Sequence, residues 1–204
     1  MAIDNDTICN SRTIGGLYTP GFSVLPSTLN YDYDKLENPY TYDPEKAKQI
    51  LDDAGIVHFG YDETAVMDVK GIKVGLVGIY ELYDHLEREQ QLKDNIAKVK
   101  ADGAQLIVVI FHWGNETETV PDSNQTTLGR IAIDEGADLV CGHHPHVLQG
   151  IETYKGRNIV YSLGNFCFGG NSSPSDMDTM IYQQTFTIAV SYTHLRAHET
   201  PEHL

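Results

Sequence analysis

The spacing of apolar residues predicts alternating strands and helices from about residue 56 onward. Two β-rich runs, residues 64–69 and 72–79, flank the turn Lys70-Gly71 and predict a hairpin whose second strand is buried. The run at 106–111 (LIVVIF) is continuously apolar, as is typical of a strand covered on both faces. Short strands are also predicted at residues 138–141 and in three later runs. These later runs are residues 150–154, 159–162 and 182–190.

Helices are predicted between these strands. Residues 86–101 carry Leu92, Ile96 and Val99 at helical spacing with charges between them, and Gly103 ends the segment. A further helix is predicted at about residues 123–135. The order strand, helix, strand, helix, strand predicts an α/β layer structure, and the later strand-only stretch predicts an added antiparallel part.

Residues 1–54 have a different composition, rich in tyrosine, proline and asparagine. Most of this stretch is predicted to be loop. One helix is expected at its end. Asp43-Pro44-Glu45 combines an N-cap residue, a proline at the first helical position and an acidic first turn. An apolar face follows, and Gly55 is expected to end the helix.

Composition and charge narrow the possible partners. Twenty-nine acidic and fourteen basic residues give a net charge of −15, which argues against nucleic acid or an anionic membrane surface as a partner. We expect a soluble chain, because no apolar run is long enough to span a membrane and the N-terminus lacks a signal-peptide pattern. Cys9, Cys141 and Cys167 are too few and too far apart for a disulfide framework, so Cys141 and Cys167 are interpreted as small buried residues.

The strongest chemical feature is a histidine cluster after an apolar strand. Gly142 is followed by His143, His144, Pro145 and His146, and the carboxyl end of a strand in an α/β sheet is where ligands bind. His112 ends the other fully apolar strand, in the motif FHWG. Two adjacent parallel strands would place these imidazoles together.

Neutral imidazole binds zinc, iron or nickel and is accepted by manganese, and such an ion converts bound water to hydroxide near neutral pH. The sequence therefore favours metal-assisted hydrolysis, and no GxSxG, GxxxxGK[ST] or HExxH motif offers another chemistry. Glu116 is either a base, a partner that orients a histidine, or a solvated loop acid. Asn165 is either a residue at the edge of the site or a turn asparagine. His58 and His85 are interpreted as hydrogen-bonded loop residues.

Three blocks in order, HWG, GHHPH and YSLGNF, carry a family resemblance. HWG stands in the stretch LIVVIFHWGNE, and GHHPH and YSLGNF stand in DEGADLVCGHHPHVLQGIETYKGRNIVYSLGNFCF. The earlier stretches AGIVHFGYDETA and VKGIKVGLVGIYE also match. The run from about 55 to 190 resembles the CapA family of poly-γ-glutamate capsule biosynthesis proteins, a branch of the calcineurin-like metallophosphoesterases. The resemblance implies an α/β/β/α sandwich with a dinuclear metal site. His112, His144 and His146 would be ligands, with His143 a neighbour of these ligands or an acid.

The chain also departs from this family pattern. An early strand ending in GD, an N-L-E block and an asparagine-asparagine-histidine block are absent. We therefore expect a partial sandwich that lacks its N-terminal strands. Neutral imidazoles alone leave much of the charge of two divalent ions uncompensated, so Mn, Zn or Fe is expected to bind weakly or not at all.

The implied function is capsule, poly-γ-glutamate or other cell-envelope polymer biosynthesis, at the cell envelope or the extracellular face. The implied reaction is attack of hydroxide on a phosphoester or an amide of a small-molecule or polymer substrate, if the site is complete. In intact relatives a membrane-bound capsule synthesis complex is the expected partner.

Two flanking segments carry other resemblances. Residues 1–54, in MAIDNDTI and YTYDPEKAKQILDDAG, resemble solute-binding proteins of peptide ABC transporters, and residues 191–204 resemble translated adaptor sequence. We therefore expect three segments, 1–54, 55–190 and 191–204, as in a chimaera of two genes with a non-native tail. The rival functions are a peptide-binding receptor and an inactive fold remnant.

Overall fold

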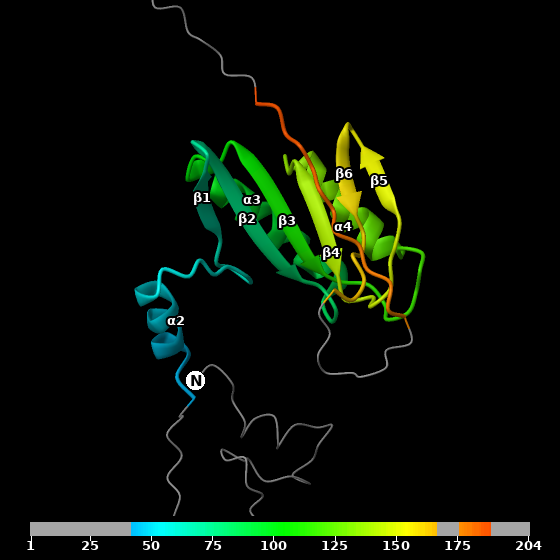
Figure 1. Cartoon of the computed structure of the whole chain (residues 1–204), viewed down its shortest axis with the longest axis horizontal. Coiled ribbons are helices and arrows are strands. Elements are labelled where there is room, and N and C mark those ends of the chain that lie inside the picture. The colour runs from blue at the N-terminus through cyan, green and yellow to red at the C-terminus, as the bar shows by residue number, and fades with distance from the viewer. Residues whose placement is uncertain (1–41, 167–175, 189–204) are drawn as a thin grey trace, which may run out of the picture.

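The computed structural model describes residues 42–166 and 176–188, and its centre is one six-stranded sheet (Figure 1). The strands are β1 (Ala65–Val69), β2 (Ile72–Tyr80), β3 (Leu106–His112), β4 (Leu139–His143), β5 (Ile151–Tyr154) and β6 (Arg157–Val160). The helices are α2 (Pro44–Asp53), the 3₁₀-helix η2 (His85–Arg88), α3 (Glu89–Ala101) and α4 (Ser123–Asp134). The predicted α/β class is confirmed.

The strand order is β1-β2-β3-β4-β6-β5. The four inner strands β2, β3, β4 and β6 run parallel, while β1 and β5 pair antiparallel at the two edges. Lys70 and Gly71 close the predicted hairpin with φ of 57° and 82°, and the Asp68 carboxylate accepts the Gly71 N–H at 2.8 Å. Because the inner strands are parallel, the carboxyl ends of β2, β3 and β4 meet at one edge of the sheet.

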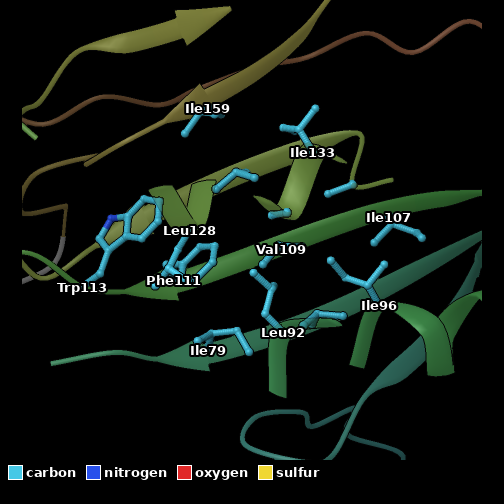
Figure 2. Close-up of a cluster of buried hydrophobic side chains, with 14 of the residues drawn as sticks. Ile79, Leu92, Ile96, Ile107, Val109, Phe111, Trp113, Leu128, Ile133 and Ile159 are labelled. Atoms are coloured by element: carbon cyan, nitrogen blue, oxygen red, sulfur yellow. The ribbon is translucent and has the colours of Figure 1, made fainter. Parts of the chain in front are cut away.

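Helices α3 and α4 cover one face of this sheet (Figure 1). The apolar side chains that they share with the strands form the core shown in Figure 2. Leu92, Ile96 and Val99 of α3 are buried, as their helical spacing predicts. Helix α4 begins with a capping box, in which Asp122 and Gln125 each accept a backbone N–H of the other.

The strand at residues 106–111 was predicted to be covered on both faces. In the described structure, helices cover only one face of the sheet at this strand. Side chains alternate along a strand, so Val109 and Phe111 pack under the helices while Val108 and Ile110 point to the opposite face. The latter two are only half-buried. The architecture is therefore one sheet with one helix layer, half of the four-layer sandwich, as expected for a partial metallophosphoesterase-like fold.

Helix α2 forms as its cap predicts, with the Asp43 carboxylate accepting the Lys46 N–H at 2.9 Å, and Gly55 follows the helix with φ of 67°. It buries none of its residues and projects from the sheet (Figure 1). The expected strand at residues 182–190 is wrong over its described part, since 182–188 carry no strand. Segments 1–41 and 191–204 lie outside the described residues. In the part of the chain that is described, no helix is both long and apolar enough to cross a bilayer.

Candidate metal centre

The carboxyl ends of three parallel strands bring the candidate residues together. His112 at the end of β3 stands in register with Tyr80 of β2 on one side and with His143 of β4 on the other. The rings of Tyr80 and His112 stack at 5.3 Å between centroids, with 7° between their planes. The juxtaposition of His112 with the loop after Gly142 is the one that the apolar pattern predicts.

The loop after β4 leaves the sheet with unusual backbone angles. His144 and His146 have backbone φ angles of 100° and 58°, in a region that residues other than glycine rarely adopt. Such strain costs of order 1–3 kcal/mol per residue and is found most often at functional sites. The strained backbone brings the His112 and His144 rings to 4.7 Å and the His144 and His146 rings to 5.7 Å between centroids.

Three side chains form a group compact enough to share one cation. Ligand atoms of Glu116, His144 and His146 all lie within 4.8 Å of one another. The loop that carries Glu116 is fastened to the histidine loop, because the Thr117 N–H donates to the Pro145 carbonyl at 2.8 Å. Two imidazoles and a carboxylate form a donor set that fits zinc, manganese or iron, with a coordination position left for water or substrate. Glu116 thus stands in this group where the family resemblance implies His112 as the third ligand.

Asn165 orients one of these imidazoles. Its Oδ1 accepts from Nδ1 of His146 at 2.7 Å, and its Nδ2 donates to the His146 carbonyl at 2.9 Å. An amide oxygen only accepts, so the proton of His146 lies on Nδ1 and the ring's lone pair on Nε2, the nitrogen that a cation would bind. The geometry favours the interpretation of Asn165 as a residue at the edge of the site.

Burial is the main cause that lowers the pKa of His112, His143 and His144 below the ordinary value. The neighbouring imidazoles lower the pKa of His112 further, while the Glu116 carboxylate partly offsets the effect of burial at His144. Near neutral pH these rings are therefore neutral, the form in which imidazole binds a metal.

His143 lies between two open hollows of the surface. One, of about 320 Å³, is lined by Phe59, Tyr80 and His112 among others. The second, of about 600 Å³, is lined by side chains that include Leu163 and Phe166. A substrate bound in either hollow would touch His143, which suits a residue that transfers a proton.

Sequence reasoning missed the carboxylate of Glu81. Glu81 directly follows β2 at the same edge as His112, and it is buried. The sequence did contain a signal for Glu81. Like His112, it stands at the carboxyl end of an apolar strand, where ligands bind. His58 and His85 are hydrogen-bonded to carboxylates, as predicted, at 3.0 Å to Asp52 and 2.7 Å to Glu81, although His85 begins the 3₁₀-helix η2 and is not in a loop.

A buried pair of glutamine side chains, which the sequence also did not predict, holds together the segments around the site. Nε2 of Gln125 donates to Oε1 of Gln149 at 2.8 Å, and Nε2 of Gln149 donates to the Glu118 carbonyl at 2.9 Å. These bonds connect helix α4 to the loop that follows the histidines and to the loop that carries Glu116. Single glutamines in loops and helix starts give no sequence signal for such a contact.

We expect Asn165→Ala to weaken binding of Mn²⁺ by about 10- to 100-fold, the usual effect of removing a partner that orients a ligand. The reason is the loss of the bond that fixes the His146 ring. Isothermal titration calorimetry measures the effect, and Gln90→Ala, which removes an exposed hydrogen bond to Asp94 on helix α3, is the control. An unchanged affinity in Asn165→Ala would show that Asn165 is only a turn residue.

Comparison with known proteins places the same residues in a family. Residues 44–170 match the family model described as bacterial capsule synthesis protein PGA_cap. The match contains every candidate residue of the site, from His112 to Asn165, and it begins before residue 55 and so includes helix α2.

Curated bacterial proteins are similar over parts of the chain. The PGA biosynthesis protein CapA of Bacillus subtilis is 32% identical over an alignment of 177 residues, and the match covers 78% of this chain and 46% of the relative. The capsule biosynthesis protein CapA of Bacillus anthracis is 49% identical over 69 residues, 34% of this chain and 17% of the relative. A probable polyglutamine synthesis accessory protein of Mycobacterium tuberculosis is 30% identical over 90 residues, 43% of this chain and 23% of the relative. The chain thus spans less than half the length of these relatives.

Proposed function

Since the chain belongs to the bacterial capsule synthesis family PGA_cap, we propose that it acts in the biosynthesis of a capsule polymer, with poly-γ-glutamate as the first candidate. The names of the Bacillus relatives support this proposal. The capsule role in the names of these relatives supports a proposed site of action at the cell envelope or the extracellular face. A small-molecule or polymer substrate and a membrane-bound synthesis complex are the proposed partners.

The group formed by Glu116, His144 and His146 is the observation that carries the proposed chemistry. In the proposal these side chains hold a divalent metal, whose chemistry is to generate hydroxide from water near neutral pH. Glu116 then binds the ion, in addition to the base role considered from the sequence. His112 lies beside this donor group, next to His144, and His143 delivers or removes a proton at the open hollows. The substrate bond is a phosphoester or an amide.

The test is metal binding first and hydrolysis second. Purified full-length protein, stripped with chelator, is titrated with Mn²⁺, Zn²⁺ and Fe²⁺ by calorimetry. It is then assayed on a nitrophenyl phosphodiester and on a γ-glutamyl amide. We expect one of the two substrates to be cleaved only after metal is added, and cleavage to stop when chelator is returned. Absence of binding for all three ions would refute the metal proposal and leave an inactive fold remnant as the better description.

We further propose that residues 55–190 carry the whole of this site and that residues 1–54 and 191–204 supply no ligand. The support is that all three members of the compact group lie between 116 and 146. Limited proteolysis of the full chain tests this. Metal affinity should be retained after the ends are trimmed, and a loss of affinity on trimming would contradict it.

A further inference from the structure

A buried carboxylate lies beside the proposed metal group without belonging to it. Glu81 is 1% exposed and lies at the carboxyl end of β2. Its backbone N–H donates to the His112 carbonyl at 2.9 Å, which continues the ladder between β2 and β3. Its Oε2 accepts the N–H of Gly114 at 3.3 Å. Glu81 therefore contacts the backbone of both the strand and the loop that present candidate ligands.

The partner that balances the charge of Glu81 is exposed. Nδ1 of His85 donates to Oε1 of Glu81 at 2.7 Å, and the His85 side chain is 57% exposed. His85 also has φ of 46°, an uncommon backbone angle for a histidine. Because the imidazole that pairs with this buried carboxylate is accessible to solvent, His85 can gain or lose its proton without a rearrangement of the core.

The proposed metal group leaves positive charge unbalanced. Glu116 supplies one negative charge, and the two imidazoles supply none, so a divalent ion there keeps a net charge of about +1. Glu81 lies beside this group, since its N–H bonds to the His112 carbonyl and the His112 ring lies 4.7 Å from the His144 ring. Charges in a poorly solvated site interact more strongly than charges in water.

We propose that Glu81 is the second negative charge of the metal centre, acting from outside the ligand group, and that His85 is its exchangeable counter-cation. Binding of a divalent ion and protonation of His85 then oppose each other through the carboxylate they share. This inference rests on the proposed metal site. It adds a residue pair that tunes the affinity of that site.

The other charges around His85 act in the same direction as Glu81. The hydrogen bond and the charge of Glu81 are the main causes that raise the pKa of His85, burial lowers it, and Asp122 and Asp84 raise it by smaller amounts. Below this raised pKa His85 is the imidazolium, and above it His85 is neutral. The opposition to metal should be present at the lower pH and absent at the higher one.

The test compares two substitutions that should change the affinity for Mn²⁺ in opposite directions. Glu81→Gln keeps the size of the side chain and removes the charge, and we expect about 10- to 100-fold weaker binding. His85→Gln keeps a donor for Glu81 and cannot become a cation. We expect it to bind Mn²⁺ about 3- to 10-fold more tightly than wild type at about pH 6 and equally at about pH 8.5. Comparison at the same pH cancels protonation of the ligands themselves.

A double variant and a matched control complete the design. In Glu81→Gln/His85→Gln the affinity should equal that of Glu81→Gln within about twofold. Once the Glu81 charge is removed, protonation of His85 has no carboxylate to neutralise. The control is Glu152→Gln on β5, a half-buried carboxylate bonded to Tyr161 and Arg130, which should leave Mn²⁺ affinity unchanged. Thermal unfolding of each variant reports folding, and His85→Gln tests the proposal even if Glu81→Gln does not fold.

The outcomes separate this inference from the proposed function. If wild type binds no Mn²⁺, the metal site itself fails. If wild type binds Mn²⁺ and His85→Gln binds equally at both pH values, the coupling is refuted and the metal site stands. Weaker binding in both single variants would indicate a purely structural role for the pair.

Discussion

We expect His144→Ala to lower the affinity for Mn²⁺ by at least about 100-fold, because it removes a central member of a three-donor group. The structure adds a second expectation at the same position. His144 has φ of 100°, so His144→Gly removes the same ligand and also relieves backbone strain. We expect His144→Gly to be more stable than His144→Ala by about 1 kcal/mol, or roughly 2–4 °C in Tm. Calorimetry and thermal unfolding measure the two effects.

The controls for this prediction also distinguish between two ligand sets. His58→Ala removes a histidine that is bonded to Asp52, away from the site, and should leave Mn²⁺ affinity unchanged. Glu116→Gln should weaken binding as much as His144→Ala, whereas His112→Ala should weaken it by only about 3- to 10-fold if His112 lies outside the ligand shell. The reverse order would favour the set of three histidines implied by the family resemblance. Unchanged affinity in His144→Ala would refute the metal centre.

Much of the fold could be predicted from the sequence because its signals are local. The hairpin at Lys70-Gly71, the cap at Asp43 and the α3 stripe each depend on residues within one or two turns of each other. The meeting of His112 and His143 could also be foreseen, since continuous apolar runs predict adjacent parallel strands. The strand expected at 182–190 failed over its described part, because apolar and β-branched residues favour an extended backbone but a strand also needs a pairing partner elsewhere in the chain.

The details of the site could be predicted less well, because they depend on contacts between distant loops. Glu116 joins His144 and His146 only because the Thr117 N–H reaches Pro145 and a buried glutamine pair supports both loops. Glu81 becomes a partner of the site because β2 ends in register with β3. In both cases the residue type was visible in the sequence, but its neighbours were set by tertiary packing.

The second large effect is expected at Gly142, where the strand β4 passes closest to its neighbours. A Cβ at this position would lie 2.0 Å from the Tyr161 carbonyl oxygen and 2.2 Å from Nε1 of Trp113. That nitrogen donates to the same carbonyl at 2.8 Å, and Trp113 is completely buried. Gly142→Ala must therefore displace backbone or break a buried hydrogen bond. We expect it to lower the free energy of unfolding by about 3 kcal/mol and Tm by roughly 10 °C.

Thermal and urea unfolding measure this effect, with Gly150→Ala as the matched control. Gly150 has open space where a Cβ would lie, so its substitution should change stability by less than about 0.5 kcal/mol. Because His143 and His144 directly follow Gly142, the displacement should also weaken Mn²⁺ binding in the protein that remains folded at low temperature. Wild-type stability in Gly142→Ala would mean that β4 and Tyr161 can separate freely. The histidine loop would then lack the rigid support that the proposed metal site requires.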